Sequence, residues 1–201
     1  MKAILLAGGT GTRMRPTTNA INKHLMPVYN KPMIYYSLSV LMLCKFREVI
    51  LICDPHSKKI FNKMFSNGKY LGMKIKILTQ KKANGIPEAF IISKKYINNQ
   101  KVCLMLGDNF FYGQGFYEVL KKGIGLKKGA FFLAYNVQQP ENYAVIVNKK
   151  NKIVNIEEKP INPKTNLVIP GIYFFDNNVV KYCETLIKSS RNELEIVDLL
   201  K

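Results

Sequence analysis

The sequence lacks tryptophan, and it has two histidines and four cysteines among 201 residues. So few histidines, together with the absence of a C-x-x-C pair, argue against a zinc site. The cysteines are far apart and each falls in an apolar segment, where a small buried thiol is ordinary. They are Cys44, Cys53, Cys103 and Cys183. We therefore expect a reduced, cytoplasmic protein.

Long hydrophobic runs are also missing. The longest apolar stretch, residues 33–44, is interrupted by Ser37 and Ser39. It is shorter than the roughly 20 apolar residues that a membrane-spanning helix needs. At the start of the chain, a short apolar run follows Lys2 and ends at Gly8, which is less than the core of a signal peptide. These observations predict a protein without a membrane partner.

Acidic residues are scarce: 13 aspartates and glutamates stand against 31 lysines and arginines, which gives a net charge of +18. The excess is spread along the chain as lysine doublets, such as Lys58-Lys59 and Lys149-Lys150. A nucleic-acid-binding module more often gathers its basic residues on one element with aromatic or helical readers. We therefore expect no nucleic-acid partner. A solvated lysine-rich background is the main interpretation, and a basic surface that attracts polyanionic substrates is the alternative.

Short apolar runs alternate with amphipathic stretches, which is typical of strands covered by helices. The pattern predicts an α/β fold, Rossmann-like, with a mostly parallel mixed sheet and helices on both faces, in a single domain over residues 1–201. Ligands of such sheets bind at the carboxyl ends of the strands. The expected strands are 2–7, 48–53, 74–79, 102–106, 130–135 and 171–175, with a hairpin of 143–147 and 152–156. The expected helices are 33–45, 56–65, 87–97, 116–122 and 178–188.

A glycine-rich loop directly follows the first predicted strand. It runs Gly8-Gly9-Thr10-Gly11-Thr12-Arg13. Glycines let backbone N–H groups approach phosphate oxygens, and an arginine adds a planar guanidinium fork. The loop lacks the Gly-Lys-Ser/Thr ending of a P-loop and the third glycine of a dinucleotide fingerprint. It predicts a phosphate site of another kind, with a simple tight turn as the alternative.

Two further residues are candidates for phosphate chemistry. Lys23 precedes an apolar stretch that ends at Pro27. Asp108 follows an apolar strand, and a carboxylate at a strand end is where a Mg²⁺ ligand facing a triphosphate is expected. The alternatives are a solvated lysine and an Asp-Asn turn. We expect Mg²⁺ as the cofactor, with Asp108 as its ligand.

Five ordered blocks resemble the glucose-1-phosphate thymidylyltransferases, members of the sugar-1-phosphate nucleotidyltransferase family. They are L-A-G-G-T-G-T-R-M-R-P at 6–16, N-K-H-L-M-P-V-Y-N-K-P-M-I-Y-Y at 22–36, L-G-D-N at 106–109, E-E-K-P at 157–160 and P-G-I-Y-F-F-D at 170–176. The resemblance implies the fold of nucleotide-diphospho-sugar transferases. It implies transfer of a nucleotidyl group, with dTTP and glucose 1-phosphate as the expected substrates.

The resemblance also implies residue roles. Catalysis would depend on Arg13, Lys23 and Asp108. The residues implied to bind the nucleotide are Gly8, Gly9, Thr10, Gly11, Thr12, Arg13, Gln80 and Gly85. The residues implied to bind the sugar phosphate are Tyr143, Glu158, Lys159, Gly171 and Arg191.

The sequence departs from the family pattern at three places. Ala144 follows Tyr143 where the family has glycine, and Ile86-Pro87-Glu88 replaces leucine, alanine and glutamine beside the base. Relatives of the family continue beyond Asp198 into a segment with a tryptophan–aspartate–glycine motif that supplies a second metal ligand. We therefore expect a C-terminally short form with reduced turnover, and a truncated gene product, a fragment and a working minimal form are its three interpretations. Cytidylyl or uridylyl transfer, a nucleotide-binding protein with little activity, and a homo-oligomer remain open from sequence.

Overall fold

The computed structural model describes residues 1–9, 11–150 and 152–201. The strands are β1 (Lys2–Ala7), β2 (Pro27–Val28), β3 (Lys31–Pro32), β4 (Glu48–Cys53), β5 (Lys74–Thr79), β6 (Val102–Leu106), β7 (Ala130–Phe132), β8 (Tyr135–Asn136), β9 (Ala144–Lys149), β10 (Lys152–Glu158), β11 (Leu167–Ile169) and β12 (Ile172–Phe175). The helices are α1 (Ile34–Leu43), α2 (Lys58–Phe65), α3 (Glu88–Ile97), α4 (Phe116–Ile124), α5 (Val179–Thr185) and α6 (Ile196–Leu200).

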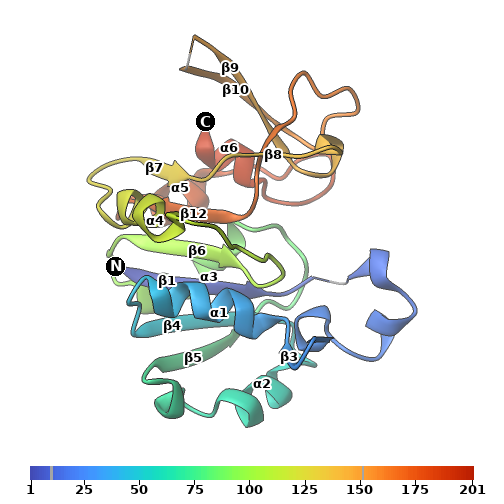
Figure 1. The fold of residues 1–201 in the computed structure, drawn as a ribbon, viewed down its shortest axis with the longest axis vertical. Helices are drawn as coiled ribbons and strands as arrows, with labels where there is room; N and C mark the ends of the chain where they lie inside the picture. Colours follow the sequence, from blue (N-terminus) through green and yellow to red (C-terminus); the bar gives the residue numbers. More distant parts are fainter. Residues whose placement is uncertain (10, 151) are drawn as a thin grey trace.

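The main sheet has six strands in the order β5-β4-β1-β6-β12-β7 (Figure 1). Strands β5, β4, β1 and β6 are parallel, and β12 and β7 add antiparallel pairs at one end. The predicted fold class, a mostly parallel mixed sheet in an α/β fold, is confirmed.

Helices cover both faces of this sheet because both sets of alternating side chains are apolar. Ala3 and Leu5 of β1 pack with α1, α2 and α4 on one face, whereas Ile4 and Leu6 pack with α3, α5 and α6 on the other. Each of these four β1 residues is at most 8% exposed. The two cores fix the sheet, and therefore fix the loops at its carboxyl edge.

A second sheet of four strands, in the order β10-β9-β11-β8, is antiparallel and was not predicted as a separate layer. Its β9–β10 hairpin, which the sequence does predict, projects beyond the main sheet in Figure 1. This small sheet brings Glu158 and Tyr143, at the end and the start of the hairpin, toward the carboxyl edge of β6.

Two predicted elements need correction. The expected strand 130–135 is two strands, β7 in the main sheet and β8 in the small sheet, because the chain crosses from one sheet to the other between Phe132 and Tyr135. The expected helix 178–188 is shorter, since α5 ends at Thr185 and Leu186 is extended. A helix at 196–200 and the short β2–β3 pair were not predicted.

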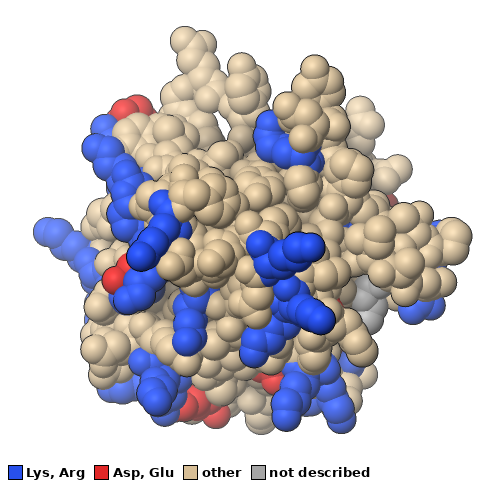
Figure 2. Space-filling model, turned by 90° about the horizontal axis from the view of Figure 1, so that it is seen from below, with Lys and Arg blue, Asp and Glu red and all other residues tan. Residues whose placement is uncertain are grey.

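The four cysteines are buried and free, as the sequence predicts. Burial raises the pKa of the Cys44 thiol to about 11, so this thiol is protonated at neutral pH. None of the helices in the described residues has the length and apolar character required to cross a bilayer. On the face shown in Figure 2, lysine and arginine side chains are spread among uncharged residues rather than gathered in one continuous patch.

Candidate active site

The glycine-rich loop and the Asp108 turn lie beside each other because their strands are parallel neighbours. Leu6 of β1 is in register with Leu106 of β6, and the Gly107 amide donates to the Leu6 carbonyl at 2.8 Å. The chain leaves β1 as the glycine-rich loop and leaves β6 as the turn that carries Asp108. A strand-end carboxylate therefore faces a loop suited to phosphate.

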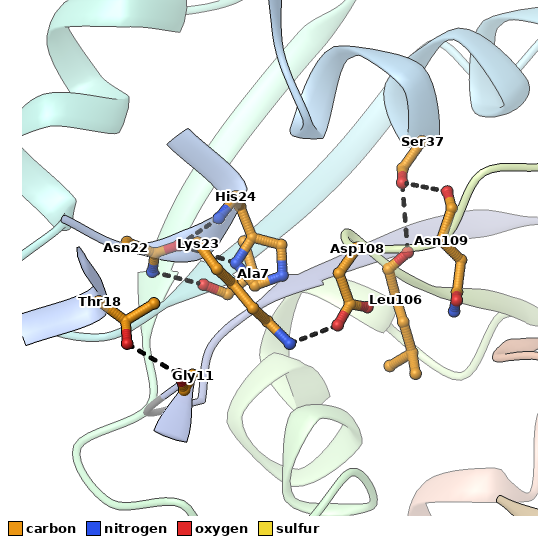
Figure 3. A network of polar contacts seen from close by, with 10 residues as sticks. All are labelled: Ala7, Gly11, Thr18, Asn22, Lys23, His24, Ser37, Leu106, Asp108 and Asn109. Atoms are coloured by element: carbon orange, nitrogen blue, oxygen red, sulfur yellow. Dashed lines mark hydrogen bonds and ion pairs between the residues drawn. The ribbon is translucent and has the colours of Figure 1, made fainter. Parts of the chain in front are cut away.

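Lys23 forms an ion pair with Asp108 across this edge (Figure 3). Both side chains are partly buried, with 23% and 29% of their surfaces exposed. Burial by itself would raise the pKa of Asp108, but the charge and hydrogen bond of Lys23 outweigh it and hold that pKa below its ordinary value. Asp108 is therefore an anion at neutral pH, and its nearest cation is a residue that the sequence also singled out.

Asn22 and His24 hold the turn that carries Lys23. The Asn22 Oδ1 accepts from the His24 amide at 2.9 Å and lies 2.7 Å from His24 Nδ1. The Asn22 Nδ2 donates to the Ala7 carbonyl at 3.0 Å and to Asp54 at 2.7 Å (Figure 3 shows the Ala7 contact). This asparagine thus ties the Lys23 turn to the ends of both β1 and β4.

The His24 ring is 1% exposed, and burial lowers its pKa to about 4, so it is neutral near pH 7. Since Asn22 Oδ1 can only accept, Nδ1 carries the ring proton. A Cβ atom at Gly107 would lie 2.8 Å from His24 Cδ2, so only glycine lets the ring approach the Asp108 turn this closely. In the sequence His24 directly follows Lys23, but nothing there indicates that the His24 ring packs against Gly107.

We call one part of the cleft the base-side compartment, because it contains Gln80 and Gly85, which the sequence predicts to bind the nucleotide. It is a cavity of about 320 Å³ whose lining includes Gly8, Gln80, Gly85 and Arg191. Gln80 directly follows β5, and Gly85 is held by the segment before α6, with which it forms a parallel bridge at Leu194. Its lining combines the Gln80 amide and small or apolar residues with charged side chains, which are Lys23, Asp108, Glu158, Lys159, Arg191, Glu193 and Glu195.

We call the adjoining part the sugar-side compartment, because it contains Tyr143 and Gly171, which the sequence predicts to bind the sugar phosphate. It is a cavity of about 560 Å³ whose lining includes Arg13, Tyr143 and Gly171. Both compartments are lined by Lys23 and Asp108, and both are lined by a second charged pair. That pair is Glu158 and Lys159. The Lys23–Asp108 ion pair therefore lies where the two compartments meet.

The two carboxylate oxygens of Glu158 differ in their hydrogen-bond and ion-pair partners. Its Oε1 is 3.2 Å from the Arg191 guanidinium and 3.8 Å from Lys159 Nζ. Its Oε2 is buried and accepts no hydrogen bond from residues 1–9, 11–150 or 152–201. Burial, and then the charge of Glu195, raise the pKa of Glu158 against the opposing charges of Lys159 and Arg191. An acceptor left open inside the cleft suits a hydroxyl donor on a ligand.

Glu195, which sequence reasoning missed, binds Arg191 in a bidentate ion pair. Arg191 Nε donates to Glu195 Oε1 at 3.0 Å, and its NH2 group donates to Oε2 at 2.6 Å. This pair is spaced four residues apart, which is the one signal in the sequence that could have suggested it. In this structure Arg191 is paired with two carboxylates, and its phosphate contact stays a prediction.

The structure brings the predicted site residues to one cleft, and their individual roles stay predictions. Thr10 lies outside the described residues. The residues that line one or both compartments are Gly8, Gly9, Gly11, Thr12, Arg13, Lys23, Gln80, Gly85, Asp108, Tyr143, Glu158, Lys159, Gly171 and Arg191.

Comparison with family models matches residues 2–201 to the nucleotidyl transferase family. The chain belongs to this family. Among curated relatives of this nucleotidyl transferase, the glucose-1-phosphate thymidylyltransferase of Neisseria meningitidis serogroup A is 45% identical over 200 residues, which is 99% of this chain and 69% of the relative. The enzyme of the same name from Mycobacterium tuberculosis H37Rv is 42% identical over the same shares.

Two solved structures have the same fold as this chain. A structure from Bacillus anthracis, described as a glucose-1-phosphate thymidylyltransferase in complex with sucrose, is 35% identical and superposes with a TM-score of 0.91 over 99% of this chain and 80% of that one. A UDP-glucose pyrophosphorylase with UDP-glucose is 21% identical, with a TM-score of 0.83 over 99% of this chain and 84% of that one, and shares the fold.

Proposed function

We propose that this nucleotidyl transferase joins dTTP and glucose 1-phosphate to give dTDP-glucose and pyrophosphate. The observation that carries the proposal is the Lys23–Asp108 ion pair at the junction of the two compartments. A nucleotide in one compartment and a sugar phosphate in the other would meet at their phosphates, beside these two residues. The similarity to named thymidylyltransferases supports the choice of substrates.

The reaction needs alignment and charge neutralisation rather than a protein nucleophile. A phosphate oxygen of glucose 1-phosphate attacks the α-phosphorus of dTTP, and the bond from that phosphorus to the bridging oxygen of pyrophosphate breaks. Both reactants are anions, so bringing them together is the main barrier that the protein must lower. Arg13 and Lys23 would neutralise phosphate charge, and the backbone N–H groups of the glycine-rich loop would hold the triphosphate.

Lys23 would change partner when the triphosphate binds. Its ammonium group pairs with Asp108 in this structure, and phosphate oxygens would compete for it. That exchange would expose the Asp108 carboxylate to the phosphates. The Asn22–His24 contacts would keep the Lys23 turn in place while the side chain moves.

Asp108 fits a magnesium ion that arrives with the nucleotide. Magnesium takes one or two carboxylates together with phosphate oxygens and waters. Asp108 supplies one such carboxylate at the cleft, and within the described part of the chain no three acidic, histidine or cysteine side chains are arranged so that they could hold a metal ion by themselves. We propose Asp108 as its protein ligand; when bound, the ion supplies charge stabilisation at the reacting phosphates.

The test is a substrate panel with Mg²⁺. The purified chain is given dTTP, UTP, dCTP, CTP, ATP or GTP, each with glucose, galactose or mannose 1-phosphate. We expect pyrophosphate release with dTTP and glucose 1-phosphate above a control without sugar phosphate, and the nucleotide sugar is identified by chromatography. Nucleotide binding without pyrophosphate release would show a binding protein and refute the proposed activity. Preference for CTP or a purine nucleotide would refute thymidylyl transfer.

A further inference from the structure

The bidentate pair between Arg191 and Glu195 fixes the plane of the Arg191 guanidinium. Glu195 lies directly before α6, is 7% exposed, and accepts from both Nε and Nη2 of Arg191. The guanidinium is rigid and planar, so a carboxylate that holds its Nε–Nη2 edge also fixes the direction of its third nitrogen, Nη1. The orientation of Arg191 is therefore set before a ligand arrives.

Ser189 holds both members of this pair. Its Oγ donates to Glu195 Oε1 at 2.6 Å and accepts from the Arg191 amide at 3.2 Å. The loop also closes on itself, since the Ser189 amide donates to the Glu193 carbonyl at 2.9 Å and the Asn192 amide donates to the Ser189 carbonyl at 2.8 Å. One hydroxyl thus connects the backbone that carries Arg191 to the carboxylate that holds its side chain.

Glu158 is the second carboxylate on this guanidinium, and it makes a single contact. Its Oε1 accepts from Arg191 Nη2 at 3.2 Å. Burial, and then the charge of Glu195, raise the pKa of Glu158. Burial alone would also raise the pKa of Glu195, but the hydrogen bonds from Arg191 and Ser189 outweigh it and lower that pKa. Glu195 is therefore the firmly held partner of Arg191, and Glu158 is the partner that a ligand could replace.

Arg191 keeps one nitrogen for a ligand. Its contacts with the two carboxylates use Nε and Nη2, and among the described residues no hydrogen bond or ion pair uses Nη1. This nitrogen carries two N–H donors. The Arg191 side chain is 38% exposed and lines the base-side compartment together with Glu158 and Lys159, which both compartments share. An oxyanion in this part of the cleft could accept from Nη1 without breaking the pair with Glu195.

We propose that Glu195 is a positioning residue that holds Arg191 so that its Nη1 donors meet the phosphate of the sugar phosphate. The inference rests on the proposed function, in which the cleft takes a sugar 1-phosphate. Glu195 does not touch the substrate and acts through Arg191. When the phosphate binds, Arg191 releases Glu158 and keeps both contacts with Glu195. The released carboxylate of Glu158 is then available to hydroxyl groups of the sugar.

Two roles of Glu195 predict opposite effects of its removal. As a negative charge beside Arg191, it repels a phosphate, so charge alone would make Glu195→Gln bind the sugar phosphate more tightly. As a positioning group, it lowers the cost of ordering the guanidinium on binding. Glutamine keeps one acceptor, but its NH2 group would oppose the other nitrogen of Arg191. We expect positioning to prevail, because solvent screens the charge of the partly exposed Arg191.

The test measures binding and turnover by the full chain. For Glu195→Gln, the dissociation constant of glucose 1-phosphate, measured by calorimetry, should rise about tenfold, the scale of one hydrogen bond. The KM for glucose 1-phosphate in pyrophosphate release should rise in parallel, while kcat and the KM for dTTP change less. Glu118→Gln makes the same chemical change in an exposed ion pair with Lys121 on α4, and it should leave all four values unchanged.

A double-mutant cycle with Arg191→Ala separates positioning from damage to the loop. If Glu195 acts through Arg191, adding Glu195→Gln to Arg191→Ala should cause no further loss of affinity for glucose 1-phosphate. If Glu195→Gln only disturbs the start of α6, the losses caused by the two substitutions should add. Additive losses would refute the positioning role.

The outcomes distinguish this inference from the proposed function. Tighter or unchanged binding of glucose 1-phosphate by Glu195→Gln would refute the inference, and the proposed function stands if the unchanged protein releases pyrophosphate. If the unchanged protein turns over no nucleotide, the proposed activity fails, and the calorimetry with glucose 1-phosphate still tests Glu195. If the unchanged protein does not bind glucose 1-phosphate, with or without dTTP, the inference is refuted.

Discussion

Two polar side chains of the cleft, Gln80 and Glu158, are held in opposite ways. On the base side, the neutral amide of Gln80 is locked by two acceptors, Glu88 and the Gly85 carbonyl. Where the two compartments meet, Glu158 is paired with Arg191 and Lys159, and its second oxygen is left open among the described residues. Gln80 is a neutral amide in a fixed orientation, and Glu158 belongs to a set of charges that neutralise one another.

This difference indicates two modes of recognition. A fixed amide can distinguish bases by hydrogen-bond direction with little rearrangement, because its orientation is set before the ligand arrives. Charged residues that pair with each other must exchange partners to take a phosphate or a hydroxyl. We therefore expect salt to weaken sugar-phosphate binding more than base discrimination, since screening acts on charges.

The largest expected effect is at the junction that both compartments share. Asp108→Asn removes the anion that we propose as the magnesium ligand, and turnover should fall by roughly a thousandfold, because metal stabilisation of a transition state is worth several kcal/mol. Turnover is measured as steady-state pyrophosphate release at fixed Mg²⁺. Circular dichroism and dTTP calorimetry should show a folded protein that still binds nucleotide. Near-normal rates would make Asp108 a turn residue only.

Arg13→Ala should have the next largest effect, with kcat falling roughly a hundredfold and KM changing less. The reason is that Arg13 lines the sugar-side compartment, which Lys23 and Asp108 also line, and charge at the α-phosphate develops mainly in the transition state. Arg47→Ala, at an exposed position outside both compartments, is the matched control. A rise in KM with unchanged kcat would mean that Arg13 contributes binding alone.

Glu158→Gln tests the carboxylate that the sequence predicts to bind the sugar phosphate. The variant keeps the shape of the side chain but can place an NH2 donor where the open acceptor Oε2 lies, so KM for glucose 1-phosphate should rise about tenfold while KM for dTTP changes less. Glu157→Gln changes the neighbouring residue of β10, which points to the opposite face of the strand and pairs with Lys164. Equal effects of the two variants on both substrates would remove the distinction between the compartments.

The smallest expected effect is a shift in the pKa of Asp108. Lys23→Met removes the cation that lowers the pKa of Asp108 and leaves the burial that raises it, so this pKa should move upward. In the unchanged protein the lowered pKa stabilises the fold above the ordinary aspartate range, and that contribution is lost as pH falls through the folded-state pKa. Lys23→Met should reduce this contribution of Asp108 to stability. Carbon NMR of labelled aspartates follows the titration, and an unchanged Asp108 pKa would show that the ion pair does not form in solution.

Much of the fold follows from local pattern. Apolar runs bounded by turn residues locate β1, β4, β5 and β6 closely, because a strand buried on both faces is apolar along its whole length. The split of 130–135 could not be predicted, since the two halves are equally suitable for a strand and differ only in which sheet they join. The small sheet was missed for the same reason: its pairing joins segments far apart in the sequence.

The sequence by itself determined which residues could handle phosphate: a glycine-rich loop after a strand, a carboxylate at a strand end, and the lysine and arginine near them. These depend on residue type and local spacing. Only the tertiary structure decided their partners, such as Glu88 for Gln80, Glu195 for Arg191 and the His24 ring for Gly107. The orientation of an amide and the charge on a carboxylate depend on atoms within a few ångströms, and only the folded structure determines which atoms these are.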